Sequence, residues 1–223
     1  MRKLFVILTA YLSWGVCAAS AQDTQLWTAL SVNGPAQNDS RFLLWFDGHA
    51  RYSEDVSRLG VSIIRPGVGY KVNDRISLWA GYAHVISRAD GRENIVDNRI
   101  WQQATYSIAG GDWGSLSGRT RLEQRFLNTG DETGHRLRQT FRYRKPLDDR
   151  WTATVWNEVF IALNDTDFGA NAGFDQNRTF FGLNYKVSDR VRVEGGYLLN
   201  ILNNNGGNNA ENNNISLSIS ASL

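Results

Sequence analysis

The sequence predicts an all-β protein, specifically an antiparallel transmembrane β-barrel of about ten strands, with twelve as the other possible count. Three observations predict this class. The chain begins with an export signal, polar and apolar residues alternate in segments of membrane-strand length, and one such segment runs to the last residue. A soluble protein seldom ends on an alternating strand, because its unpaired edge would be open to other chains.

Residues 1–21 have the organisation of a cleaved signal peptide. Arg2 and Lys3 precede a short apolar core, and Ala19-Ser-Ala21 provides a cleavage site of small residues. The core is shorter than the ~20 residues that a helix needs to cross a bilayer. We therefore expect export through the general secretory pathway and a single mature domain, residues 22–223. Cleavage also removes Cys17, the only cysteine, and so excludes thiol chemistry in the mature chain.

The mature chain is expected to carry no net charge. Removing Arg2 and Lys3 from the 24 lysines and arginines leaves 22, against 22 aspartates and glutamates. Such a balance favours ion pairs within the protein. Nucleic acid is not an expected partner, because the arginines alternate with lipid-facing residues and form no external basic patch.

Segments of roughly 9–12 residues, the length of a tilted membrane strand, recur between turn signals. We expect strands at residues 41–51, 59–71, 75–86, 97–108, 116–126, 135–145, 151–162, 176–187, 190–201 and 214–223. Short Asn-, Asp- or Ser-containing turns follow Tyr70, Tyr143 and Tyr185, and residues 110–114 form a fourth. The connections between them are longer, at residues 87–96, 127–134, 163–175 and 202–213. Alternation of this kind indicates short periplasmic turns and longer external loops.

Both ends of the mature chain carry alternating segments. Residues 26–32 read as a further strand, which could pair with 41–51, pack inside the lumen, or bring the total to twelve together with one more strand. In the last segment, Ile215, Leu217, Ile219, Ala221 and Leu223 alternate with Asn214 and four serines. We expect this strand to close the barrel, with its apolar face in lipid and the carboxylate in the periplasm.

Successive side chains of a strand point to opposite sides, so parity assigns the faces. A charge at the lipid midplane costs about 2–4 kcal/mol, so the charged face of each strand should line the lumen. The predicted lumen arginines are Arg119, Arg121, Arg125, Arg136, Arg138, Arg142, Arg144, Arg178 and Arg192. The predicted lumen carboxylates are Asp47, Glu123, Glu158 and Glu194.

Several motifs resemble one bacterial family. They are Trp27-Thr-Ala-Leu-Ser31, the Arg119-x-Arg-x-Glu-x-Arg125 row, the Arg136-x-Arg138 pair, Asn157-Glu158, Phe174-Asp-Gln-Asn-Arg-Thr-Phe-Phe-Gly182 and Glu194-Gly-Gly-Tyr197. Across nearly the whole mature chain, the sequence resembles the uncharacterised outer-membrane barrels called domain of unknown function 2490. The resemblance implies a barrel in the outer membrane of a Gram-negative bacterium, but no activity.

Two functional hypotheses follow from the lumen. Arginine holds anions through paired hydrogen bonds, so the lumen could be a narrow channel for small anions. Alternatively, the carboxylates pair with the arginines and make the interior structural, because small barrels are filled by their own side chains. We expect no enzyme, cofactor or metal. The expected partners are outer-membrane lipid, lipopolysaccharide and the barrel-insertion machinery, and the oligomeric state stays open.

A hydrolase acting on lipid or lipopolysaccharide is the alternative from another class. His49 and Asp47 share the predicted lumen face and are two residues apart, as an acid-oriented base requires. A hydrolase of this type also needs a nucleophile near the base, and the sequence has no Gly-x-Ser-x-Gly motif.

Overall fold

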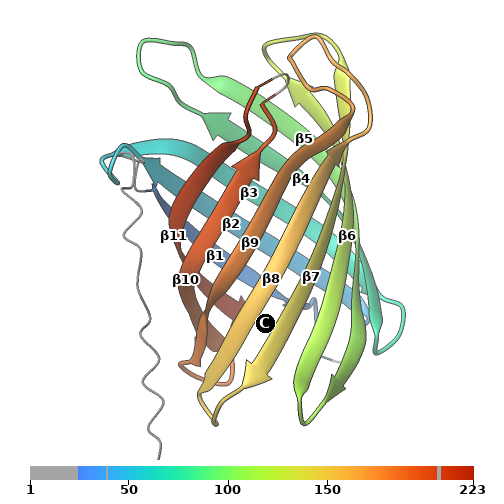
Figure 1. Cartoon of the computed structure of the whole chain (residues 1–223). Helices are drawn as coiled ribbons and strands as arrows, with labels where there is room; N and C mark the ends of the chain where they lie inside the picture. Colours follow the sequence, from blue (N-terminus) through green and yellow to red (C-terminus); the bar gives the residue numbers. More distant parts are fainter. Residues whose placement is uncertain (1–24, 39, 205–206) are drawn as a thin grey trace, which may run out of the picture.

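Eleven β-strands form a closed barrel in the computed structural model, which describes residues 25–38, 40–204 and 207–223 (Figure 1). The strands are β1 (Gln25–Pro35), β2 (Phe42–Ser53), β3 (Arg58–Lys71), β4 (Ile76–Ser87), β5 (Ile95–Gly111), β6 (Gly114–Leu127), β7 (Thr133–Pro146), β8 (Trp151–Ala162), β9 (Gly173–Lys186), β10 (Val191–Leu202) and β11 (Ala210–Ser222). The all-β barrel predicted from the sequence is confirmed. The predicted signal peptide, residues 1–21, lies outside the described residues.

The seam that closes the barrel differs from the prediction. Consecutive strands are antiparallel, but β1 pairs with β11 in parallel, from Gln25 opposite Asn214 to Asn33 opposite Ser222. The expectation of a fully antiparallel barrel with an even strand number is therefore corrected for the described chain. Residues 26–32 belong to β1, which pairs with β2 on its other side. Alternation alone could not settle this point, because parallel and antiparallel strands share the same side-chain period of two residues.

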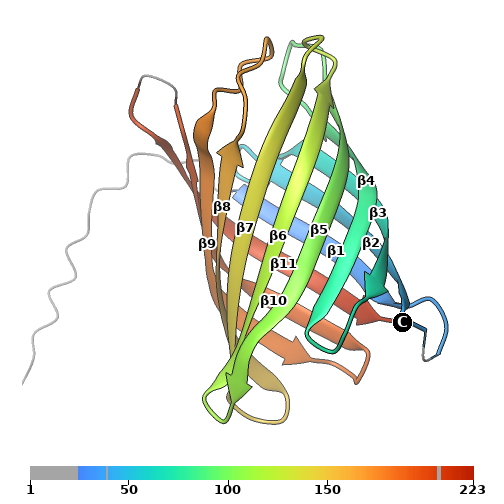
Figure 2. The ribbon, with the colours of Figure 1, turned by 90° about the vertical axis from the view of Figure 1, so that its right-hand side faces the viewer.

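The connections gather at two rims (Figures 1 and 2). The turn rim carries residues 36–38, 40–41, 72–75, 112–113, 147–150 and 187–190, together with the end of β11. The loop rim carries residues 54–57, 88–94, 128–132, 163–172, 203–204 and 207–209, together with the start of β1. Because the strand number is odd, Gln25 and Leu223 lie at opposite rims.

Three similar turns at the turn rim are stabilised by the same pair of side-chain-to-backbone hydrogen bonds. A side-chain oxygen of Asn73, Asp148 or Ser188 accepts hydrogen bonds from the backbone amides two and three residues later. At Asp148 these bonds, from Trp151 and Arg150, measure 2.7 and 2.8 Å. They hold the pKa of the Asp148 carboxyl below its usual value.

The two faces of the wall differ as the parity argument requires. Large apolar side chains such as Phe42, Val68 and Ile215 are exposed on the outside, while Arg121 and Glu123 are buried inside. The outer face also carries neutral polar side chains that bond to one another. Gln102 and Gln124, for example, exchange bonds of 3.1 and 3.3 Å. Among the residues described, no helix is long and apolar enough to span a membrane.

Candidate functional site: a charged septum and a basic vestibule

Buried and half-buried side chains fill the lumen near the middle of the strands. We call this layer the septum. It consists of Trp27, Asp47, Arg51, Arg65, Asp97, Arg99, Trp101, Gln103, Arg119, Arg121, Glu123, Arg125, Arg136, Arg138, Glu158, Phe160, Arg178 and Phe180. Trp101 and Arg121 are 0% exposed, and Glu123, Phe160 and Phe180 are 1% exposed, so solvent does not reach these groups.

Glu158 is the first of two carboxylates that organise the arginines. Its Oε1 accepts hydrogen bonds from Arg119 Nη2 at 2.7 Å, from Arg138 Nε and Nη2 at 3.0 and 2.8 Å, and from Thr140 Oγ1 at 3.1 Å. The donors stand on β6 and β7, whereas Glu158 stands on β8. One carboxylate thus ties three strands together, and the guanidinium groups satisfy a charge that would otherwise be costly to bury.

Glu123 is the second. Arg138 Nη1 donates to its Oε1 at 2.7 Å, and Arg136 Nη2 donates to its Oε2 at 2.7 Å. Arg138 therefore bridges Glu123 and Glu158. Arginine suits this role because its planar group presents donors in several directions.

Two further clusters extend the network around the wall. Asp97 Oδ2 accepts from Arg99 Nη2 at 2.7 Å and from Arg125 Nη2 at 2.6 Å. On the other side, Asp47 accepts from Arg65 Nε at 2.9 Å and lies 3.1 Å from His49 Nε2.

Guanidinium groups stacked on aromatic rings extend the septum into the lumen. The Arg178 guanidinium lies 4.6 Å from the centre of the Phe160 ring and 4.9 Å from the centre of the Trp27 ring. Arg51 lies 3.9 Å from the same Trp27 ring. Phe160 and Arg178 belong to β8 and β9, whereas Trp27 and Arg51 belong to β1 and β2. The contact between Arg178 and Trp27 therefore joins β9 to β1 through the lumen, past the two strands that separate them in the wall.

Small residues make room for the largest ring. Trp101 packs against β3 and β4 at Gly67 and Gly81, where an added Cβ would collide with the Trp101 ring. Trp45 packs edge-on against Trp101, with ring centres 6.4 Å apart. These aromatic contacts fill one side of the septum with apolar atoms.

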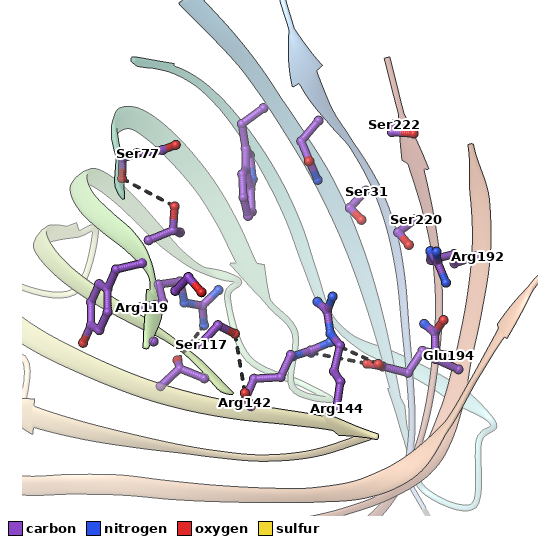
Figure 3. Close-up of a pocket in the computed structure, with 18 of the residues that line it drawn as sticks. Ser31, Ser77, Ser117, Arg119, Arg142, Arg144, Arg192, Glu194, Ser220 and Ser222 are labelled. Carbon is purple, nitrogen blue, oxygen red and sulfur yellow. Dashed lines mark hydrogen bonds and ion pairs between the residues drawn. The ribbon is translucent and has the colours of Figure 1, made fainter. Parts of the chain in front are cut away.

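Between the septum and the turn rim lies a cavity of about 640 Å³, which we call the vestibule (Figure 3). Its basic lining residues are Lys71, Arg75, Arg119, Arg142, Arg144, Arg190 and Arg192. Its acidic ones are Asp74, Asp189 and Glu194, of which Glu194 is bonded to Arg142 at 3.0 Å. On the opposite wall, β1 and β11 contribute Ser31, Ser218, Ser220 and Ser222. The vestibule is therefore polar with an excess of positive charge.

The structure places every predicted lumen arginine and carboxylate on the inner face. Arg121, Arg125, Arg136, Arg138, Arg178, Asp47, Glu123 and Glu158 lie in the septum, and Arg142, Arg144, Arg192 and Glu194 line the vestibule, while Arg119 touches both. The pair His49 and Asp47 is also brought together.

Sequence reasoning missed Arg65, Asp97 and Arg99. Arg65 occupies the position that the hydrolase hypothesis would leave open, since its Nη2 lies 3.0 Å from His49 Nε2. In 97–108, the inner residues Asp97, Arg99, Trp101 and Gln103 do share a parity. That signal is weak because Asn98 and Gln102 place polar groups on the outer face as well.

The closed wall, the apolar exterior and the charged interior define a β-barrel of the kind found in outer membranes. The chain belongs to the family described as Protein of unknown function (DUF2490), whose model matches residues 24–211.

An uncharacterized protein of Methylorubrum extorquens is 38% identical over 185 residues, which cover 81% of this chain and 79% of that protein. The NanC porin structure aligns over 91% of this chain and 100% of its own, with a TM-score of 0.54 and 14% identity, and so shares the fold. The translocator domain of autotransporter NalP from Neisseria meningitidis aligns over 80% of this chain and 71% of its own, with a TM-score of 0.42 and 10% identity.

Proposed function

We propose that this protein is a non-enzymatic barrel in the outer membrane of a Gram-negative bacterium, exported through the general secretory pathway. Its lumen admits small anions and forms a channel of low conductance. The observation that carries the proposal is the vestibule, where seven basic residues stand against three acidic ones. A cavity with an excess of one sign of charge raises the local concentration of the opposite ion. The septum restricts the passage of ions, because its central residues are solvent-inaccessible.

Planar bilayers containing the purified full chain test this function. We expect small, infrequent conductance steps that favour anions. Arg142→Glu should reduce the preference for anions, because it reverses a charge on the vestibule wall. Arg150→Glu is the matched control, since Arg150 lies on a turn and bonds outward to the Tyr185 hydroxyl at 2.9 Å.

A variant with a looser septum extends the test to the case in which the wild-type protein shows no conductance steps. Phe160→Ala removes the ring that lies against Arg136, Arg138 and Arg178. We expect larger and more frequent steps from this variant. Membranes that stay silent with both folded wild type and folded Phe160→Ala would overturn the conduction proposal, as would a preference for cations.

The alternative hydrolase would use His49 as the base and Asp47 as its orienting acid, 3.1 Å apart. Asp47 Oδ1 and Arg65 Nη2 both contact the same ring nitrogen, His49 Nε2, at 3.1 and 3.0 Å. An acid-oriented base bonds its acid through one ring nitrogen and takes a proton with the other. Because the acid and a buried arginine converge on one nitrogen here, we favour a structural role for His49. Hydrolysis of phospholipid or lipopolysaccharide by wild type, lost in His49→Ala, would reverse this choice.

A further inference from the structure

Four buried hydrogen-bond donors of the septum, on three side chains of β5 and β6 that contact one another, have no partner among the described residues. They are Arg121 Nη1, Arg121 Nη2, Gln103 Nε2 and Trp101 Nε1. Arg121 and Trp101 are 0% exposed, and Gln103 is 4% exposed. Gln103 is directly opposite Arg121 in the strand register, and its Oε1 accepts from Arg121 Nε at 2.8 Å. The Arg121 guanidinium also lies 4.6 Å from the centre of the Trp101 ring. A buried donor left unpaired costs about 1–3 kcal/mol, so a ligand is expected to satisfy such a group.

The charge of Arg121 is poorly compensated by the protein. Its ion pair with Glu123 spans 3.9 Å between Nη1 and Oε1. That same oxygen already accepts a 2.7 Å hydrogen bond from Arg138. The septum as a whole also has more positive than negative side chains. It contains nine arginines and four carboxylates, with Asp175 nearby. A buried positive charge without a close partner needs an anion.

The pattern of groups distinguishes an anion from a water molecule. A water molecule has two lone pairs and accepts two hydrogen bonds, fewer than the four unpaired donors, whereas a halide ion accepts from several donors at once. The side chains that carry the donors are almost inaccessible to solvent, which favours a small ion over a larger oxyanion.

We propose that Arg121, Gln103 and Trp101 bind a small monovalent anion of the halide class within the septum. The ion accepts from the guanidinium, the amide and the indole, and it supplies the negative charge that Arg121 lacks.

A route to the site starts in the vestibule. Arg119 lines the vestibule and stands two residues before Arg121 on the same face of β6. Its Nε is also buried without a partner among the residues described. This route rests on the proposed function, but halide binding itself is measured without conduction, so the two proposals can fail separately.

Thermal unfolding of the full chain in detergent micelles tests the site. Sodium chloride or bromide is compared with sodium isethionate, a larger organic anion, at one ionic strength. We expect the midpoint to rise and saturate with halide, by about 5–11 °C at a hundred times the dissociation constant. Arg121→Met should abolish the rise. Arg150→Met, which removes the same charge from an exposed turn, should retain it.

A second variant decides the matter where Arg121→Met does not fold. Gln103→Glu places a carboxylate opposite Arg121 and so supplies the missing charge within the chain. We expect this variant to be stable without halide and insensitive to its addition. A wild-type midpoint equal in chloride and isethionate would overturn the proposal, and so would a full halide response in Gln103→Glu.

Discussion

Replacing Glu158 by glutamine should destabilise the barrel far more than the same change at Glu194. Glu158 Oε1 accepts three hydrogen bonds from arginines, at 2.7, 2.8 and 3.0 Å, and it is 3% exposed. Glutamine keeps an oxygen but loses the charge, which leaves Arg119 and Arg138 partly uncompensated. Each charge-assisted bond is worth about 1.5–3 kcal/mol against about 0.5–1.5 for a neutral one. We therefore expect a loss of about 3–5 kcal/mol in the free energy of unfolding, as for other broken buried ion pairs.

Glu194 provides the matched comparison. It bonds one arginine, Arg142, whose side chain is 29% exposed in the vestibule. Solvent can replace much of that interaction, so Glu194→Gln should cost at most about 1 kcal/mol.

Denaturant unfolding in detergent, followed by tryptophan fluorescence, measures both changes. An equal or smaller loss in Glu158→Gln would refute the view that the septum carboxylates hold the network together. A double-mutant cycle with Arg138→Met sharpens the test, because directly bonded partners should deviate from additivity by more than about 0.5 kcal/mol.

Three further predictions concern packing, pH and topology. Gly81→Ala should cost several kcal/mol or prevent folding, because its Cβ would collide with the Pro66 carbonyl oxygen and the Trp101 ring. Gly48→Ala, with its nearest atom 3.8 Å away, should be tolerated, and heat-dependent gel mobility would compare the two. The lowered pKa of Asp148 contributes stability that is present above the unfolded aspartate pKa, about 4, and is lost as pH falls through the lower folded value. Asp148→Asn keeps the acceptor oxygen and should flatten this part of the acid unfolding profile, and an unchanged profile would contradict the assignment. Epitopes placed before Gln25 and after Leu223 should label from opposite sides of the membrane, whereas labelling from one side would contradict the odd strand number.

The sequence was sufficient to predict the barrel and most of the residues that line its lumen. In a strand with one face in lipid, the charged face must point to the lumen. In β7, Arg136, Arg138 and Arg142 alternate with Leu137 and Phe141, and the structure places them as parity requires. The ion-pair partners of these arginines could not be predicted from the sequence. Glu158 is 20 residues from Arg138 in the chain, and their contact depends on the register between β7 and β8, which alternation does not specify.

Other features depended on neighbours that the sequence pattern does not reveal. Arg65 is surrounded in β3 by Ile63, Ile64 and Pro66, so its face carries no run of charges. Gln102 and Gln124 satisfy each other on the outer face, which a rule based on polarity assigns to the lumen. Parallel closure was hidden for a related reason, since the partner of β1 is the strand most distant from it in the chain.

That seam also has a consequence for the order of assembly. Ten of the strand pairings join neighbours in the chain and can form as local hairpins, whereas the pairing of Gln25 with Asn214 joins the two extremes of the described barrel. Contacts of such sequence separation form slowly, because a long loop must first be closed. The parallel seam should therefore be the last pairing to form, after β11 has been made and placed. Until then, β1 and β11 both present open edges, and the time spent in that state sets how long the folding chain is exposed to aggregation.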